Sequence, residues 1–348
     1  MKLPFNSFEP DFELLLKVLR RETTPRPVLF EFMLNLDICQ LAAGWDHKPE
    51  PGSIEYYRMI MEAFRSLGYD YAPVYTWKSG LFSFPKGDQL SLASKSLNQG
   101  AVITDRESFE RYPWPDARSA NYEIYDRLEP YLPAGMKLVG FSNGGILENA
   151  TDLVGFDNLC MMYLEDPELT VEVFEHIGKR LLDFYTIVAS MNSVGACVVN
   201  DDWGFKTQTM FPPDMMDSYV FPYTKKIIRA IHEKGKPVIL HSCGNLKSIM
   251  DVIIDELRID GKHSFEDGIF PVEDAYAWWH DRIAIIGGID VDYLSRRSPE
   301  KIYRRSLNLL ETTSVSGGFA LGSGNSIPAY IPPENYLSML KAAADFGK

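Results

Sequence analysis

Short apolar runs alternate with longer amphipathic stretches along this chain of 348 residues. Such an alternation is typical of repeated strand and helix units that build a parallel β-sheet. Most of the short runs are apolar throughout, as expected of strands that are covered on both faces. The pattern predicts eight strands, at residues 27–34, 69–75, 137–142, 196–202, 237–243, 259–265, 283–290 and 317–324.

The helices predicted around these strands have recognisable N-termini. Asp166-Pro167-Glu168 and Ser298-Pro299-Glu300 each place a capping residue before a proline, followed by an acid near the positive end of the helix. Pro212-Pro213-Asp214 and Pro332-Pro333-Glu334 show the same proline and acid without a capping side chain. Four helices are therefore expected to begin at these prolines.

Eight strands with intervening helices predict a single-domain (β/α)₈ TIM barrel over residues 1–348, a fold whose core needs about 250 residues. The additional residues form an N-terminal extension before Pro27 and a long insertion after the second strand, at about residues 76–136. The competing fold is an open doubly wound sheet. No GxGxxG motif follows the first strand, which argues against the dinucleotide-binding version of that fold.

The composition of the chain indicates which binding partners are excluded and in which cellular compartment the protein is expected. The chain has 35 Lys+Arg and 48 Asp+Glu, a net charge of −13, which repels nucleic acid and anionic membrane surfaces. Its start lacks the apolar core of a signal peptide, and no later run of about 18 apolar residues could span a bilayer. Four cysteines are too few for a disulfide scaffold in a chain of this length, so we expect a reduced cytoplasmic protein.

Polar residues gather where the predicted strands end. In a parallel barrel the carboxyl ends of the strands carry the active site, so this distribution predicts a pocket at that rim. We expect Asn143, Asp290 and Asn325 to bind substrate there. The clusters are Asn200-Asp201-Asp202, His241-Ser242-Cys243, His263 with Glu266 and Asp267, Gly287-Gly288-Ile289-Asp290 and Gly322-Ser323-Gly324-Asn325-Ser326.

His241 and Cys243 are the strongest candidates for chemistry. Residues two apart on a strand face the same side, so the imidazole and the thiol project together. Nitrogen and thiolate ligands suit Zn²⁺, and Glu266 or His263 on the next strand are candidates for a third ligand. One alternative is a buried histidine bonded to backbone beside an inert thiol, and another is a Cys–His nucleophilic pair.

Four acidic positions are further candidates. Asp201 and Asp202 point to opposite faces, so only one can face the barrel mouth, where it could bind a metal or substrate or act as a general base. The alternative for these aspartates is a capping role. Glu31, inside the first predicted strand, needs a buried partner unless it binds substrate. Glu148 is either a catalytic group at the mouth or a first-turn helix charge.

Aromatic residues follow the second predicted strand. Tyr75 and Trp77, with Phe82 and Phe84, could form the floor or lid of a site for a flat apolar ligand. The alternative is a hydrophobic core beneath the insertion. The remaining histidines, on predicted loops or helices, are expected to be solvated: His47, His176, His232 and His280.

Several of these motifs resemble those of the uroporphyrinogen decarboxylase superfamily, and the likeness covers most of the chain from about Lys137 onward. The resemblance implies a (β/α)₈ barrel. It also implies one of two activities, that of the porphyrinogen decarboxylases or that of zinc-dependent methyltransferases that work with corrinoid proteins. The matching motifs are His241-Ser242-Cys243-Gly244-Asn245, Gly287-Gly288-Ile289-Asp290, Gly317-Gly318 and Gly322-Ser323-Gly324-Asn325.

The methyltransferase branch is the better match. The decarboxylases have an Arg-rich segment after the first strand that binds the carboxylates of their substrate, whereas residues 31–37 here contain no Arg. Their key Asp after the second strand is replaced within residues 74–77. In the methyltransferases a His-x-Cys pair and a distant Cys bind zinc. His241 and Cys243 match the pair, and Asn325 occupies the third position.

The resemblance therefore implies methyl transfer between a small substrate and the cobalt of a separate corrinoid protein. Zinc would be held by His241, Cys243 and an acidic neighbour, and Asp201 or Asp202 would orient the substrate or handle the proton. The insertion would shield the pocket or dock the corrinoid partner. Two alternatives are a decarboxylase acting on a tetrapyrrole or another carboxylate, and a barrel that binds a ligand without turnover.

Overall fold

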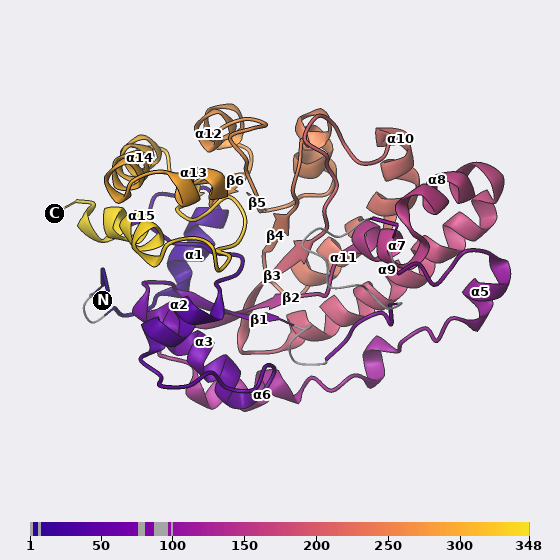
Figure 1. Cartoon of the computed structure of the whole chain (residues 1–348), viewed down its shortest axis with the longest axis horizontal. Helices are drawn as coiled ribbons and strands as arrows, with labels where there is room; N and C mark the ends of the chain where they lie inside the picture. The colour runs from indigo at the N-terminus through magenta and orange to yellow at the C-terminus, as the bar shows by residue number, and fades with distance from the viewer. Residues whose placement is uncertain (1–2, 6–7, 76–80, 87–96, 99, 348) are drawn as a thin grey trace.

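The computed structural model describes the chain except residues 1–2, 6–7, 76–80, 87–96, 99 and 348. Seven parallel strands form one curled sheet in the order β1 to β7, each beside its neighbour in sequence. Helices lie around these strands (Figure 1). The strands are β1 (Tyr71–Tyr75), β2 (Lys137–Phe141), β3 (Val194–Asn200), β4 (Val238–His241), β5 (Gly261–His263), β6 (Ala284–Ile286) and β7 (Phe319–Ala320).

The register of the sheet brings several strand ends to one level. Asn200 at the end of β3 pairs with His241 at the end of β4, which pairs with His263 at the end of β5. His263 in turn pairs with Ile286 of β6. Paired residues on parallel strands point to the same face, so the side chains of His241 and His263 start from neighbouring positions.

Residues 27–34, predicted as the first strand, do not form a regular strand, which corrects the prediction. Single parallel bridges join Leu29 to Leu321 and Leu34 to Ile327, so the segment runs beside the chain around β7. Elsewhere the predicted strands correspond to β1 to β7, with shorter bounds at most ends.

The reason lies on the other side of this segment, where tyrosine side chains of β1 replace a backbone ladder. Tyr71 Oη accepts from the backbone N–H of Glu31 at 2.8 Å and donates to the Glu31 carbonyl at 2.5 Å. Tyr75 Oη donates to the carbonyl of Phe32 at 2.9 Å. Because the backbone groups of the segment are satisfied by hydroxyls, no strand-to-strand pairing with β1 forms there.

The four predicted helix starts are confirmed. The helices that begin at Pro167, Pro213, Pro299 and Pro333 have proline in the first turn, where a missing N–H is tolerated. Asp166 caps the first of them by accepting from the N–H of Leu169 at 2.9 Å, whereas Ser298 makes no side-chain capping bond.

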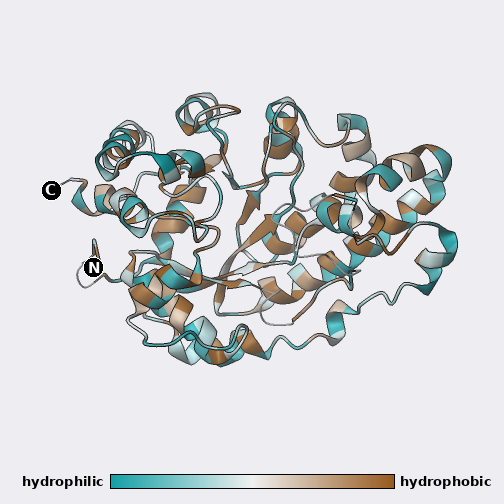
Figure 2. Ribbon diagram, viewed as in Figure 1, coloured by the Kyte–Doolittle hydropathy of each residue, from teal (hydrophilic) through white to brown (hydrophobic). Residues whose placement is uncertain are grey.

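The helices are amphipathic, with apolar residues toward the strands and polar residues outward (Figure 2). The apolar face of α9 (Pro167–Ser190) is buried, and each of its large apolar side chains contributes about 1.5–3 kcal/mol. None of the described helices is long and apolar enough to cross a bilayer. The helices are α1 (Phe12–Leu19), α2 (Leu36–Ala43), α3 (Ile54–Ser66), α5 (Arg106–Arg111), α6 (Glu123–Leu128), α7 (Ile146–Val154), α8 (Phe156–Glu165), α9 (Pro167–Ser190), α10 (Pro213–Met215), α11 (Phe221–His232), α12 (Val272–Trp279), α13 (Val291–Arg296), α14 (Pro299–Thr313) and α15 (Pro333–Asp345).

Candidate functional site

Three potential metal ligands converge at the carboxyl ends of β3 and β4. A carboxylate oxygen of Asp202, a ring nitrogen of His241 and Sγ of Cys243 all lie within 4.8 Å of one another. Nε2 of His241 is 3.9 Å from Sγ of Cys243. Asp202 is held in place because its Oδ1 accepts from the backbone N–H of Cys243 at 2.8 Å. Within the described residues this is the one group of its kind.

A pair of glycines lets the two loops approach closely enough for this contact. Gly244 has a φ of 85°, and a Cβ at this position would collide with the carbonyl of Gly204. The N–H of Asn245 donates to the carbonyl of Phe205 at 2.8 Å, which joins the loops beside the glycines. Only glycine meets both requirements at position 244, so the loop after β3 can deliver Asp202 to the end of β4.

The donor set fits a zinc ion. Catalytic zinc sites use three protein ligands and keep a fourth position open, and bonds of 2.0–2.3 Å place tetrahedral ligand atoms about 3.3–3.8 Å apart. The 3.9 Å between nitrogen and sulfur is close to that separation. Oxygen, nitrogen and sulfur ligands are also those that Zn²⁺ accepts, so Asp202, His241 and Cys243 could hold it.

The other two proposed ligands lie outside this group. Nδ1 of His263 is 2.7 Å from Nδ1 of His241, and Nε2 of His263 is 3.3 Å from the carbonyl oxygen of Ser323. Both ring nitrogens of His263 are thus engaged, and a metal could reach neither without breaking a contact. Glu266 lines a cavity and is absent from the three-ligand group.

The sulfur of Cys243 is surrounded by hydrogen-bond donors. Nδ2 of Asn325 donates to it at 3.2 Å and Oγ of Ser264 donates at 3.5 Å. Burial, followed by the charge of Asp202, raises the pKa of the Cys243 thiol. Two donors favour an anionic sulfur, whereas burial opposes it. The arrangement therefore suits a thiolate whose charge a bound cation would offset.

Sequence reasoning missed two residues that shape this environment, Lys262 and Ser264. Ser264 has a φ of 85°, which is strained for a residue with a side chain. The buried ammonium of Lys262 donates to the carbonyl of Ser264 and, at 3.0 Å, to that of Ser242. Burial lowers the pKa of Lys262 to about 8. The sequence signal for Lys262 was a charged residue in the middle of the strand predicted at residues 259–265, where the pattern expects covered positions.

Asp201 caps a helix and does not join the three ligands. Its carboxylate accepts from the N–H groups of Ile146 and Leu147, both at 3.0 Å, and of Glu148 at 2.8 Å, at the start of α7. Burial raises its pKa to about 6. Asp201 is 1% exposed, so its role is the capping alternative, and Asp202 is the aspartate that faces the site.

Glu148 is positioned to hold a proton beside Asp202. Burial, followed by the charges of Asp202 and Asp201, raises the pKa of Glu148 well above its ordinary value. Its Oε2 accepts from the N–H of Gly145 at 3.3 Å. A protonated carboxyl next to a carboxylate is the usual outcome when two acids share a buried site.

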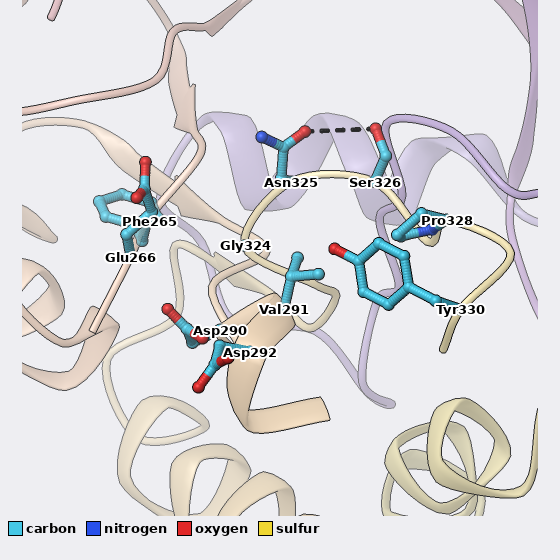
Figure 3. A pocket seen from close by; sticks show the side chains of 10 residues that line it. All are labelled: Phe265, Glu266, Asp290, Val291, Asp292, Gly324, Asn325, Ser326, Pro328 and Tyr330. Carbon is cyan, nitrogen blue, oxygen red and sulfur yellow. Dashed lines mark hydrogen bonds between the residues drawn. The ribbon is translucent and has the colours of Figure 1, made fainter. Parts of the chain in front are cut away.

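A cavity of about 430 Å³ is lined by Asn325, among other residues (Figure 3). Asn325 connects it to the three ligands, which do not line it themselves, because its Nδ2 donates to Sγ of Cys243. Phe265 and Glu266 form one side of it, and Asn325 and Tyr330 form others. The carboxylate of Glu266 makes no hydrogen bond or ion pair with the described part of the chain, whereas its backbone carbonyl accepts from the N–H groups of Ile269 and Phe270. Asp290 also lines the cavity, but its oxygens accept from the backbone N–H groups of Tyr293 at 3.0 Å and Asp267 at 2.8 Å, so it caps α13.

The remaining predicted substrate-binding residues do not line this cavity. The carboxylate of Glu31 accepts from Ser323, and burial raises its pKa to about 8. Tyr75 is buried and bonded to residue 32. Asn143 accepts through its backbone carbonyl from Asn149 Nδ2 at 3.2 Å. Trp77 lies outside the described residues.

The aromatic residues after the second predicted strand pack under the insertion. Phe82 stacks on Phe184 of α9 with ring centroids 5.9 Å apart, and Phe84 contacts Trp114 at 6.3 Å. Both are buried. Their position matches the core alternative.

The expectation of solvated histidines holds only for His47, which is exposed. His232 pairs with Asp260 at 2.8 Å, and Nδ1 of His280 is 2.8 Å from the Tyr276 carbonyl. His176 is partly buried among aromatic rings. The rings of these three residues are only partly exposed, because they pack against neighbouring rings or form hydrogen bonds.

Comparisons with known proteins agree with the fold. Among curated proteins, the methylcobamide:CoM methyltransferase MtbA of Methanosarcina acetivorans is 28% identical over 138 residues, which are 38% of this chain and 37% of that protein. The match therefore spans little more than a third of that relative. A solved structure described as a methyltransferase from Methanosarcina mazei has a TM-score of 0.68 and 14% identity, covering 95% of this chain and 97% of that one.

At 14% identity the structural match establishes a shared fold, that of an α/β protein with a curled parallel sheet. A family model described as uroporphyrinogen decarboxylase (URO-D) matches residues 98–346. Because this match covers more than two thirds of the sequence, the chain belongs to the uroporphyrinogen decarboxylase family.

Proposed function

We propose that this protein is a methyltransferase that moves a methyl group between a small substrate and the cobalt of a separate corrinoid protein. The observation that carries the proposal is the convergence of Asp202, His241 and Cys243 at the end of the sheet, next to a cavity of about 430 Å³. The resemblance to a methylcobamide:CoM methyltransferase supports the same reaction class.

Asp202, His241 and Cys243 would hold Zn²⁺. When bound, the ion supplies Lewis acidity, which lowers the pKa of a coordinated thiol or hydroxyl so that it is anionic at neutral pH. Asn325 stands at the position of the distant Cys ligand of the methyltransferases. It is not a ligand in this proposal, because its Nδ2 donates to Cys243 Sγ. It positions the sulfur and forms the wall between the three ligands and the cavity.

Protons are handled by Glu148 in this proposal. Burial raises the pKa of its carboxyl group, so the protonated form can give a proton to a leaving group and the ionised form can take one from an acceptor. Asp201 acts on Glu148 indirectly, since it fixes the N-terminus of α7 by accepting from three backbone N–H groups. The insertion at residues 76–136 would shield the pocket or dock the corrinoid protein.

Decarboxylation of a tetrapyrrole has weaker support. Such a substrate carries several carboxylates, and a pocket for it needs basic residues. Glu266, Asp290 and Asp292 line the cavity at Asn325, whose described lining contains neither Arg nor Lys. The same three acids also line a neighbouring cavity of about 580 Å³, which contains Lys206, Arg296 and Arg297 but not Asn325. The basic side chains thus lie away from Asn325, and the charge of the cavity at Asn325 favours a substrate without several negative groups.

Metal content and methyl transfer together test the proposal. Purified protein is expected to contain about one zinc per chain, and His241→Ala and Cys243→Ala are expected to lose it. His280→Ala and Cys160→Ala, which change the same residue types outside the site, should retain it. With methylcobalamin in place of the corrinoid protein and a thiol as acceptor, loss of the Co–CH₃ absorbance should require the metal. Substoichiometric zinc in the wild type, or equal turnover by Cys243→Ala, would refute the proposal.

A further inference from the structure

The histidine pair at the ends of β4 and β5 forms a directed hydrogen-bond chain. His241 and His263 approach through their Nδ1 atoms at 2.7 Å, and Nε2 of His263 is 3.3 Å from the Ser323 carbonyl. Both rings are buried, with His263 at 0% exposure. Phe32 stacks on His241 with a centroid separation of 3.7 Å and an angle of 2°, which holds the ring in its plane.

When both rings are neutral, the hydrogen-bond chain has only one consistent arrangement of protons. A carbonyl oxygen can only accept, so Nε2 of His263 carries the hydrogen in its contact with Ser323. In a neutral imidazole the other nitrogen is then an acceptor, so His263 Nδ1 is bare. His241 must donate to it from Nδ1. Nε2 of His241 consequently has a free lone pair on the side of Cys243 Sγ.

The acceptor that sets this direction is held firmly. The Ser323 carbonyl also accepts from the N–H of Gly288 at 3.0 Å. On the other side of the residue, Ser323 donates its N–H and its Oγ to the carboxylate of Glu31 at 2.5 and 2.7 Å. The N–H of the peptide group that carries this carbonyl, which is the N–H of Gly324, donates to the carbonyl of Ile289 at 2.7 Å, so this peptide cannot rotate to present its N–H to His263.

A glycine keeps the space that the chain needs. Gly287 has a φ of 76°, and a Cβ there would lie 2.9 Å from His263 Nε2 and would collide with the Ser323 carbonyl oxygen. A larger residue at position 287 would thus displace both the donor and the acceptor of the hydrogen bond between His263 Nε2 and the Ser323 carbonyl. This gives the first glycine of the Gly287-Gly288 motif a role in the histidine chain, independent of the contacts of His241.

We propose that His263 is a positioning residue that, by donating to the Ser323 carbonyl, fixes His241 as the Nδ1–H tautomer and leaves its Nε2 free to bind a metal. The assignment of His241 as a ligand rests on the proposed function. The tautomer itself does not, because it follows from hydrogen bonds present without a metal.

The tautomer can be measured on metal-free protein by ¹⁵N spectroscopy of the six histidine side chains, with His241→Ala to assign the signals. Wild-type His241 should be protonated at Nδ1. His263→Gln should preserve this state, since its amide can accept from His241 and donate to Ser323. His263→Leu removes the acceptor and should give a mixture of tautomers. His280→Gln is the matched control and should leave His241 unchanged.

Metal affinity provides the second readout, through titration with Co²⁺ and its sulfur charge-transfer absorbance. We expect His263→Leu to lose about 10–100-fold in affinity and His263→Gln to stay within about 3-fold of the wild type. Protonation of wild-type His241 at Nε2, or full affinity in folded His263→Leu, would overturn the proposal. An Nδ1–H tautomer in a wild type that binds no Co²⁺ would support the positioning role and sink the metal-assisted function.

Discussion

Two regions of the site are built on opposite principles. Behind the strand ends, Glu31, Asp201, His263 and Ser323 form a buried layer in which hydrogen bonds to the protein use the carboxylate, ring and hydroxyl groups. In front of it lies the cavity wall of Phe265, Glu266, Asn325 and Tyr330. There Tyr330 is 69% exposed, and the carboxylate of Glu266 has no hydrogen-bond or ion-pair partner among the described residues.

The difference separates positioning from recognition. A group whose hydrogen bonds are satisfied by protein cannot adapt to a ligand, but it can hold its neighbours to within a fraction of an ångström. A side chain that faces a cavity can change its conformation to suit a ligand, because the ligand supplies its hydrogen-bond partner. Changes in the buried layer should therefore alter stability, and changes in the cavity wall should alter binding alone.

The largest effect is expected from Glu31, through pH. Its folded-state pKa of about 8 exceeds the ordinary 4.5, so its stabilising contribution is complete below pH 4.5 and is lost as pH rises through 8. Glu31→Gln removes this dependence. The free energy of unfolding of the wild type should fall relative to the variant by up to about 5 kcal/mol between pH 4 and 9. Urea denaturation at several pH values measures it, and parallel curves would contradict it.

A smaller effect is expected where Asp201 caps α7. Asp201→Ala leaves three backbone N–H groups at a buried helix start without their acceptor and should lower the free energy of unfolding by about 3 kcal/mol. Asp202→Ala, the neighbouring control, removes one acceptor and should lower it by about 1 kcal/mol. Equal losses for the two variants in urea denaturation would show that the aspartates are not divided in this way.

The smallest effect should come from the cavity wall. Glu266→Gln keeps the size of the side chain and removes a charge without a polar partner in the described structure, so the free energy of unfolding should change by less than about 0.5 kcal/mol. Co²⁺ affinity should stay within about 3-fold, since Glu266 is outside the three-ligand group. A loss of more than 10-fold in a Co²⁺ titration would instead make Glu266 a ligand.

Much of the frame could be predicted from the sequence, because buried parallel strands are continuous apolar runs and first-turn prolines mark helix starts. Residues 27–34 were predicted wrongly as a strand. Their backbone groups are satisfied by hydroxyls of Tyr71 and Tyr75, which are far away in sequence and leave no local pattern.

The candidate site likewise has features that local sequence predicts and features that depend on the tertiary structure. The projection of His241 and Cys243 to one side follows from strand periodicity alone. The third member of the group depends on how the loop after β3 crosses the loop after β4, so the choice of Asp202 over Glu266 and His263 could not be read from residue types. The pairing of the two histidines depends on sheet register, which the sequence does not display.

The seam between residues 27–34 and β1 has a consequence for motion. The hydroxyls of Tyr71 and Tyr75 supply the hydrogen bonds that a backbone ladder would otherwise make here, so removing either hydroxyl should loosen this edge of the sheet. Phe32 belongs to the seam and lies flat against His241. Loosening this edge would move the Phe32 ring away from the imidazole, so two tyrosine hydroxyls on β1 would support the orientation of His241 from a distance.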